Sequence, residues 1–149
     1  MEDLCPFPDA ALVKTIRKQH SQAQFIELSN RIEFSREECS KLNPEFLRYV
    51  VYHEIGHWFR WNHIPQHKID GSRLPGENFL ILDCDNPEEG FADGFAAFFI
   101  ERHVLARKHP FHDGLLDEML SEHEGRIRDC CEEMFRWLSH QLGLGEHFL

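Results

Sequence analysis

Two histidines and a glutamate in one short stretch have the spacing of a water-activating metal site. The stretch reads HEIGH, from His53 to His57. Residues four apart on a helix project from the same face, so both imidazoles can bind one zinc ion at about 2.0–2.1 Å. Glu54 lies about 100° further around the helix, where it can accept a proton from a water whose pKa zinc lowers to about 7. The pattern predicts His53 and His57 as metal ligands and Glu54 as the general base.

A catalytic zinc usually takes three protein ligands and a water, and two residues compete for the third place. Glu89 lies in a second helical stretch, NPEEGFADGFAAFF, in which Glu89 and Asp93 share one face. Glu89 would bind the metal, and Asp93 would accept the remaining ring N–H of His53 or His57. His63, six residues after the second histidine, is the other candidate.

The sequence favours Glu89 over His63 as the third ligand. If the helix continues to residue 62, His63 is turned about 120° from the ligand face. Arg60 also stands where a metzincin-type chain has the glycine that lets it turn. Both motifs have plainer interpretations: the two histidines are partly buried and hydrogen bonded, and Glu89 completes a capping box with Asn86. The occurrence of both motifs in order, each on its own helix, favours the metal site.

At these residues the chain resembles the gluzincin metallopeptidases. Their pattern is H-E-x-x-H followed on a later helix by E-x-x-A-D, and here it is carried by residues 53–57 and 89–93. The pair Phe95-Ala96 that follows is similar to ImmA/IrrE-type peptidases, and among gluzincins these and the minigluzincins are the nearest soluble branches. The resemblance covers residues 43–100. It implies a zincin-like fold, bound Zn²⁺ and a sheet edge that holds an extended substrate.

The function that the resemblance implies is that of a zinc metalloendopeptidase. The substrate would be a protein or peptide, and a transcriptional regulator is one candidate. Gluzincins also use a His, Tyr or Arg to stabilise the oxyanion. The alternative function is a non-catalytic zinc-binding regulatory or protein-interaction module on the same fold. The candidates for the oxyanion role are His103, His109, His112 and His123.

Helix start signals place both motifs on helices. Asn43-Pro44 and Asn86-Pro87 each put a capping side chain before a proline in the first turn. The first helix is predicted to run to about Asn62 and the second from Glu88 to about Ala106. The other predicted elements are a helix over Ala10–His20 capped by Asp9, a β-hairpin of residues 25–28 and 32–34 around Ser29-Asn30, one turn capped by Ser35, a strand over Phe79–Leu82 and an interrupted helical region from Leu115 to Leu142.

Length and composition limit the class of protein. The chain has 149 residues, of which 42% are hydrophobic, which favours one domain over residues 1–149. Its 13 phenylalanines predict a core rich in aromatic side chains. We expect an α+β fold that is mainly helical with a short antiparallel sheet. The net charge of −10 argues against nucleic acid as a partner. No apolar run is long enough to span a bilayer, and the N-terminus lacks the apolar core of a secretory signal, so we expect a cytoplasmic protein without a membrane partner.

Overall fold

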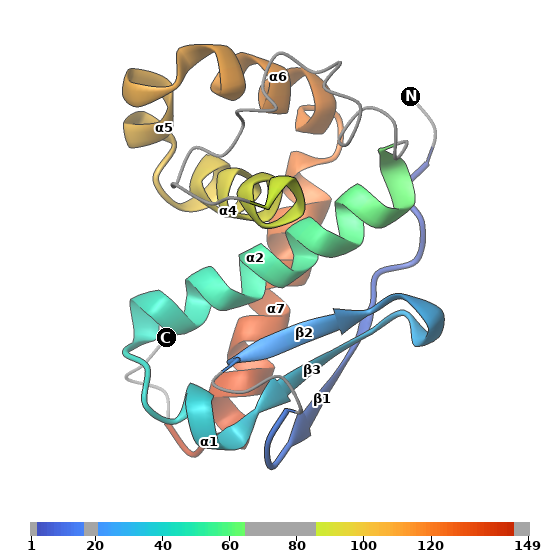
Figure 1. Ribbon diagram of the computed structural model, residues 1–149, viewed down its shortest axis with the longest axis vertical. Coiled ribbons are helices and arrows are strands. Elements are labelled where there is room, and N and C mark those ends of the chain that lie inside the picture. The colour runs from blue at the N-terminus through green and yellow to red at the C-terminus, as the bar shows by residue number, and fades with distance from the viewer. Residues whose placement is uncertain (1–2, 17–20, 65–85, 145–149) are drawn as a thin grey trace.

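Helices make up most of the described chain, and a small sheet lies against one of them (Figure 1). The computed structural model describes residues 3–16, 21–64 and 86–144. Within these ranges the predicted α+β class is confirmed, with six α-helices and one three-stranded sheet. The elements in chain order are β1 (Asp9–Val13), β2 (Ala23–Ile26), the 3₁₀-helix η1 (Glu27–Ser29), β3 (Arg31–Ser35), α1 (Arg36–Cys39), α2 (Pro44–His63), α4 (Pro87–Ile100), α5 (Arg102–Lys108), α6 (Pro110–Leu120) and α7 (Glu124–Gln141).

The sheet has the strand order β1-β3-β2, so β2 is an edge strand. β2 and β3 pair antiparallel, from Ala23 opposite Phe34 to Ile26 opposite Arg31, and they form the predicted hairpin. The connection is longer than the two residues expected, because η1 and Asn30, with a left-handed φ of 49°, close it. β1 pairs parallel with β3, which makes the sheet mixed rather than wholly antiparallel.

The helix predicted over residues 10–20, with Asp9 as its N-cap, is wrong over the part that the structure describes, residues 10–16. Residues Asp9–Val13 form β1 instead. Ala10 and Leu12, which are two apart as on one face of a strand, both pack against the core. The short apolar run in this segment fits the residue spacing of either a helix or a strand. The parallel pairing with β3 favours the strand, because it supplies partners for the backbone N–H and C=O groups.

α2 begins at the predicted signal and crosses the middle of the fold. The side chain of Asn43 accepts the backbone N–H of Phe46 at 2.9 Å, and Pro44 occupies the first turn. The helix continues to His63, one residue beyond the predicted end. In Figure 1 it passes between β2 and α4, and it packs against both. α2 therefore presents the HEIGH motif between the sheet edge and the second motif-bearing helix.

α4 also begins at its predicted signal but ends earlier than expected. The side chain of Asn86 accepts a backbone N–H from the first turn at 2.9 Å. The helix ends at Ile100, because the backbone of Glu101, with φ −141° and ψ 53°, turns the chain into α5. Arg102, the first residue of α5, has its Nε 2.9 Å from an oxygen of Asp113 on α6. This ion pair and the packing of α5 on α6 stabilise α5 as a separate helix, where the sequence predicted one continuous helix.

The remaining predictions for the elements have different outcomes. The interrupted C-terminal helical region is confirmed, because α6 and α7 are separated by residues 121–123. Ser35 caps α1 as expected, accepting the backbone N–H of Glu38 at 3.1 Å. The strand predicted over Phe79–Leu82 lies outside the described residues.

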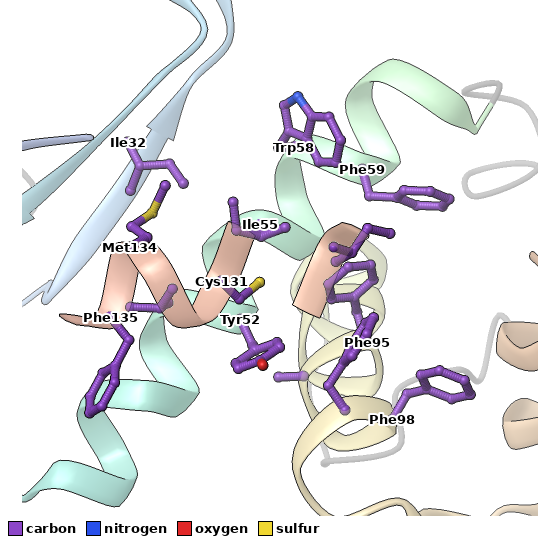
Figure 2. Close-up of a cluster of buried hydrophobic side chains, with 14 of the residues drawn as sticks. Ile32, Tyr52, Ile55, Trp58, Phe59, Phe95, Phe98, Cys131, Met134 and Phe135 are labelled. Carbon is purple, nitrogen blue, oxygen red and sulfur yellow. The ribbon is translucent and has the colours of Figure 1, made fainter. Parts of the chain in front are cut away.

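An aromatic core lies between α2, α4 and α7 (Figure 2). Trp58 and Phe59 of α2 and Phe95 and Phe98 of α4 are all buried. The rings of Phe59 and Phe95 lie 5.7 Å apart, within the range of favourable aromatic pairs. The core expected from the phenylalanine content is confirmed, and it fixes α2 and α4 against each other.

Gly56 allows the two motif-bearing helices to approach closely. A Cβ atom at this position would lie 3.1 Å from the Cα of Ala92 and 3.1 Å from the Cβ of Phe95, both on α4. Neither atom belongs to the far end of a flexible side chain, so relief of the contact requires the helices to move apart. The glycine inside HEIGH is therefore explained by helix packing.

Gly56→Ala is expected to lower the free energy of unfolding by about 1–3 kcal/mol, the usual cost of overpacking a core. Gly114→Ala is the matched control, because Gly114 lies in α6 with no atom within 4 Å of the added Cβ. That control should raise the free energy of unfolding by about 0.4–1 kcal/mol, since alanine has the higher helix propensity. Urea denaturation of the three proteins measures both changes, and equal stability of the two variants would contradict the close contact.

Candidate metal centre

Two histidines of α2 and one glutamate of α4 converge on a single point. His53 Nε2 lies 3.0 Å from Glu89 Oε1, and His57 Nε2 lies 2.9 Å from Glu89 Oε2. The two Nε2 atoms lie 3.2 Å from each other. Each of the three residues thus offers one ligand atom to a group that could hold a metal ion.

The spacing and chemistry of this triad fit a zinc ion. Ligand atoms about 2.0–2.1 Å from a tetrahedral zinc lie about 3.3 Å from one another. The distances of 2.9–3.2 Å within the triad are close to that value. Two imidazole nitrogens and one carboxylate oxygen are also a donor set of catalytic zinc sites, which keep a further position for water or substrate.

The electrostatics of the triad favour positive charge between the three residues. Burial alone would lower the pKa of His53, but hydrogen bonds to Asp93 and Glu89 outweigh it and raise the pKa to about 10. Hydrogen bonds to His53 and His57 hold the pKa of Glu89 well below its usual range. Both shifts arise from the attraction between an anionic carboxylate and a cationic partner. The negative charge of Glu89 and Asp93 would also attract a metal cation at this point.

Asp93 and Tyr49 hold the ring of His53 in place from behind. His53 Nδ1 lies 2.8 Å from Asp93 Oδ1. The hydroxyl of Tyr49, one turn before His53 on α2, donates to the same carboxylate oxygen at 3.0 Å. With Asp93 holding a proton on Nδ1, a metal ion can displace the proton on Nε2, and Nε2 then has the lone pair that a metal ligand needs. Asp93 thus lies where the sequence placed it, behind a candidate ligand.

Asp93→Asn is expected to lower zinc affinity about 10- to 100-fold, the usual effect of removing the partner of a ligand histidine. The amide would keep the size of the side chain and remove the charge that orients the imidazole. Asp129→Asn is the control, since Asp129 is an exposed carboxylate on α7. Competition for zinc against a chromophoric chelator measures the affinities, and equal values for the two variants would contradict the role of Asp93.

Glu54 is a buried carboxylate beside the triad. Its side chain is only 7% exposed, and its Oε2 lies 4.0 Å from His53 Nε2. The backbone N–H of Phe25, on the edge strand β2, also interacts with this carboxylate and lowers its pKa. Burial raises the pKa of Glu54, against the opposing effect of His57 and His53. The group therefore holds a proton more readily than an exposed glutamate, as a proton carrier requires.

His63 lies apart from the triad. Its Nε2 accepts the backbone N–H of Cys5 at 3.2 Å, and its ring stacks on Phe59 at 5.0 Å. The straight course of α2 explains this position, because six helical residues turn His63 away from the face of His57. The capping-box interpretation of Glu89 also fails, since both carboxylate oxygens face the histidines.

A cleft of about 580 Å³ opens over the triad. α2 lines it along most of its length, residues 21–25 and Glu27 border one side, and the first turns of α4 border the other. None of the four histidines proposed for the oxyanion lines the cleft; Tyr49 and Arg60 do. Sequence reasoning missed both, although Tyr49 is one turn before His53 and Arg60 is close to one turn after His57.

Comparison with known proteins identifies no relative. No protein-family profile, curated protein or solved structure matches the chain. Among the described residues, none of the helices is both long and apolar enough to cross a bilayer.

Proposed function

We propose that the protein is a zinc-dependent metallopeptidase of the gluzincin type. His53, His57 and Glu89 would hold the ion, Asp93 would orient His53, and Glu54 would act as general base. The observation that carries the proposal is the convergence of His53, His57 and Glu89 on one point, next to the buried carboxylate of Glu54.

The residues of the cleft supply the steps of a hydrolysis. Bound zinc supplies Lewis acidity, which polarises a peptide carbonyl and makes a water easier to deprotonate. Glu54 takes the proton from the attacking water, and the raised pKa of its carboxyl group keeps that proton available. Glu54 then gives the proton to the leaving amine as the C–N bond breaks. Tyr49 and Arg60 also line the cleft, but the phenol of Tyr49 donates to Asp93 and the guanidinium of Arg60 pairs with Glu88, so we assign the oxyanion to neither.

The substrate that we propose is a protein segment in an extended conformation. β2 is an edge strand and borders the cleft, and such an edge offers backbone N–H and C=O groups to another chain. The resemblance to ImmA/IrrE-type peptidases makes a transcriptional regulator one candidate, in the cytoplasm. The acidic net charge of −10 makes nucleic acid a poor ligand.

Metal dependence tests the proposal. The zinc-loaded protein is expected to cleave an unfolded protein such as casein, and excess 1,10-phenanthroline should remove the activity. One equivalent of Zn²⁺ added after removal of the chelator should restore it, and Mg²⁺ should not, because imidazole ligands favour zinc. Gel electrophoresis and mass spectrometry of the fragments follow the cleavage. Cleavage that persists in the chelator, or none at all by fully zinc-loaded protein, would contradict the proposal.

A further inference from the structure

We infer that the two ends of the cleft select different side chains of a bound peptide: an apolar one near Phe46 and a basic one near Trp61. This inference rests on the proposed function, because it concerns the substrate of the same site. Both aromatic residues belong to α2 and line the cleft on opposite sides of the triad. The surroundings of Trp61 are more acidic than those of Phe46, so we expect the two ends to bind different kinds of side chain.

The end near Phe46 is apolar. Phe46 is 61% exposed, although a phenyl ring gains free energy from burial. Leu42 and Val50 line the cleft beside it, and the start of β2 lies opposite. An exposed ring in an apolar wall marks a site where another apolar group can be buried. Phe46 thus offers a contact to an aliphatic or aromatic side chain.

The end near Trp61 combines an aromatic face with carboxylates. Trp61 is 49% exposed and lies one turn after His57 on the same face of α2. Glu27, exposed at the end of β2, and Glu88, at the start of α4, line the same cleft. A lysine or arginine side chain can contact an indole face and a carboxylate at once. This end therefore fits a basic side chain.

The charge of the whole cleft supports the same assignment. Its only described lysine or arginine is Arg60, whose guanidinium lies 3.1 Å from Glu88, so these two charges offset each other and Glu27 supplies the negative charge at this end. Even with a divalent cation on the triad, the carboxylates of the lining outnumber the positive charges. The lining carboxylates are Glu27, Glu54, Glu88, Glu89 and Asp93.

The length of α2 gives the spacing of the two selected side chains. Phe46 and Trp61 are separated by about 22 Å along the helix axis, at about 1.5 Å per residue. An extended peptide covers that distance in about six to seven residues, at about 3.3 Å each. His53 lies near the midpoint, so the two side chains fall on opposite sides of the reacting bond, each about three residues from it.

A set of synthetic decapeptides tests the inference. The parent peptide carries phenylalanine and lysine six residues apart in an otherwise Ala/Ser/Gln sequence, and a second parent has the reverse order. Partner peptides replace lysine by glutamate or phenylalanine by alanine. We measure kcat/KM with the zinc-loaded protein and binding to zinc-loaded Glu54→Gln by fluorescence anisotropy. For one of the two parents, we expect kcat/KM to be about fivefold lower when glutamate replaces lysine, as for an exposed ion pair. We expect it to be about tenfold lower when alanine replaces phenylalanine.

Variants of the cleft assign each preference to its end. Glu27→Lys should abolish the preference for lysine over glutamate, and Phe46→Ala should abolish the preference for phenylalanine. Glu45→Lys and Leu28→Ala are the controls, because both residues are exposed and neither lines the cleft. Both controls should keep both preferences.

The outcomes separate this inference from the proposed function. Cleavage of all peptides at equal kcat/KM would overturn the inference and leave the metallopeptidase proposal intact. Selective binding to Glu54→Gln without cleavage by the zinc-loaded wild-type protein would support the inference and overturn the proposed reaction. Preferences that survive Glu27→Lys and Phe46→Ala would overturn the inference, and neither binding nor cleavage would overturn both.

Discussion

Glu54→Gln is expected to slow peptide hydrolysis about 10²- to 10⁴-fold, the usual contribution of a general acid–base group. Glutamine has almost the same shape, but its amide cannot accept the proton of the attacking water. The metal should stay bound, because Glu54 Oε2 lies 4.0 Å from His53 Nε2 and Glu54 is not part of the triad. Turnover on a fluorogenic peptide and zinc content by mass spectrometry are measured on the same preparation.

Glu45→Gln is the matched control for this experiment. Glu45 is an exposed carboxylate in the first turn of α2, and it does not line the cleft. Its replacement should leave both hydrolysis and zinc content unchanged. Full activity of Glu54→Gln would exclude Glu54 as the general base. Loss of zinc together with activity would show that Glu54 acts on the metal rather than on the proton.

Glu89→Ala is expected to lower zinc affinity by more than about 100-fold, since removal of a residue that only orients a ligand already costs about 10- to 100-fold. Glu88 provides a neighbouring control on the same helix. Its carboxylate lies 3.1 Å from Arg60 rather than at the triad. Glu88→Ala should therefore bind zinc with nearly wild-type affinity, which isothermal titration calorimetry with Zn²⁺ can measure.

His63→Ala completes the comparison of the two candidate third ligands. His63 contacts Cys5 and Phe59 and lies apart from the triad, so its loss should not change zinc affinity. If Glu89→Ala kept its zinc and His63→Ala lost it, the assignment of the third ligand would be reversed.

Local signals in the sequence predicted the helices that carry the site. The asparagine caps and prolines at residues 43–44 and 86–87 act within one turn, so both helix starts are readable without knowledge of the fold. The hairpin of β2 and β3 was readable for the same reason. β1 was not, because its strand form depends on pairing with β3, and the run Ala10–Val13 has no local signal that excludes a helix.

The site itself was predictable only in part. The spacing of His53, Glu54 and His57 follows from helix geometry. The approach of Glu89 depends on the packing of α2 against α4, which Gly56 permits and which residue spacing alone does not reveal. The cleft was harder still to predict from the sequence, because Trp61 and Glu27 come from elements far apart in the chain.

The most direct test is a crystal structure of the zinc-loaded protein with anomalous data collected on both sides of the zinc absorption edge. We expect one strong anomalous peak about 2.0–2.2 Å from His53 Nε2, His57 Nε2 and a carboxylate oxygen of Glu89. A peak at other residues, or none at this triad in protein that contains one equivalent of zinc, would contradict the proposed metal site.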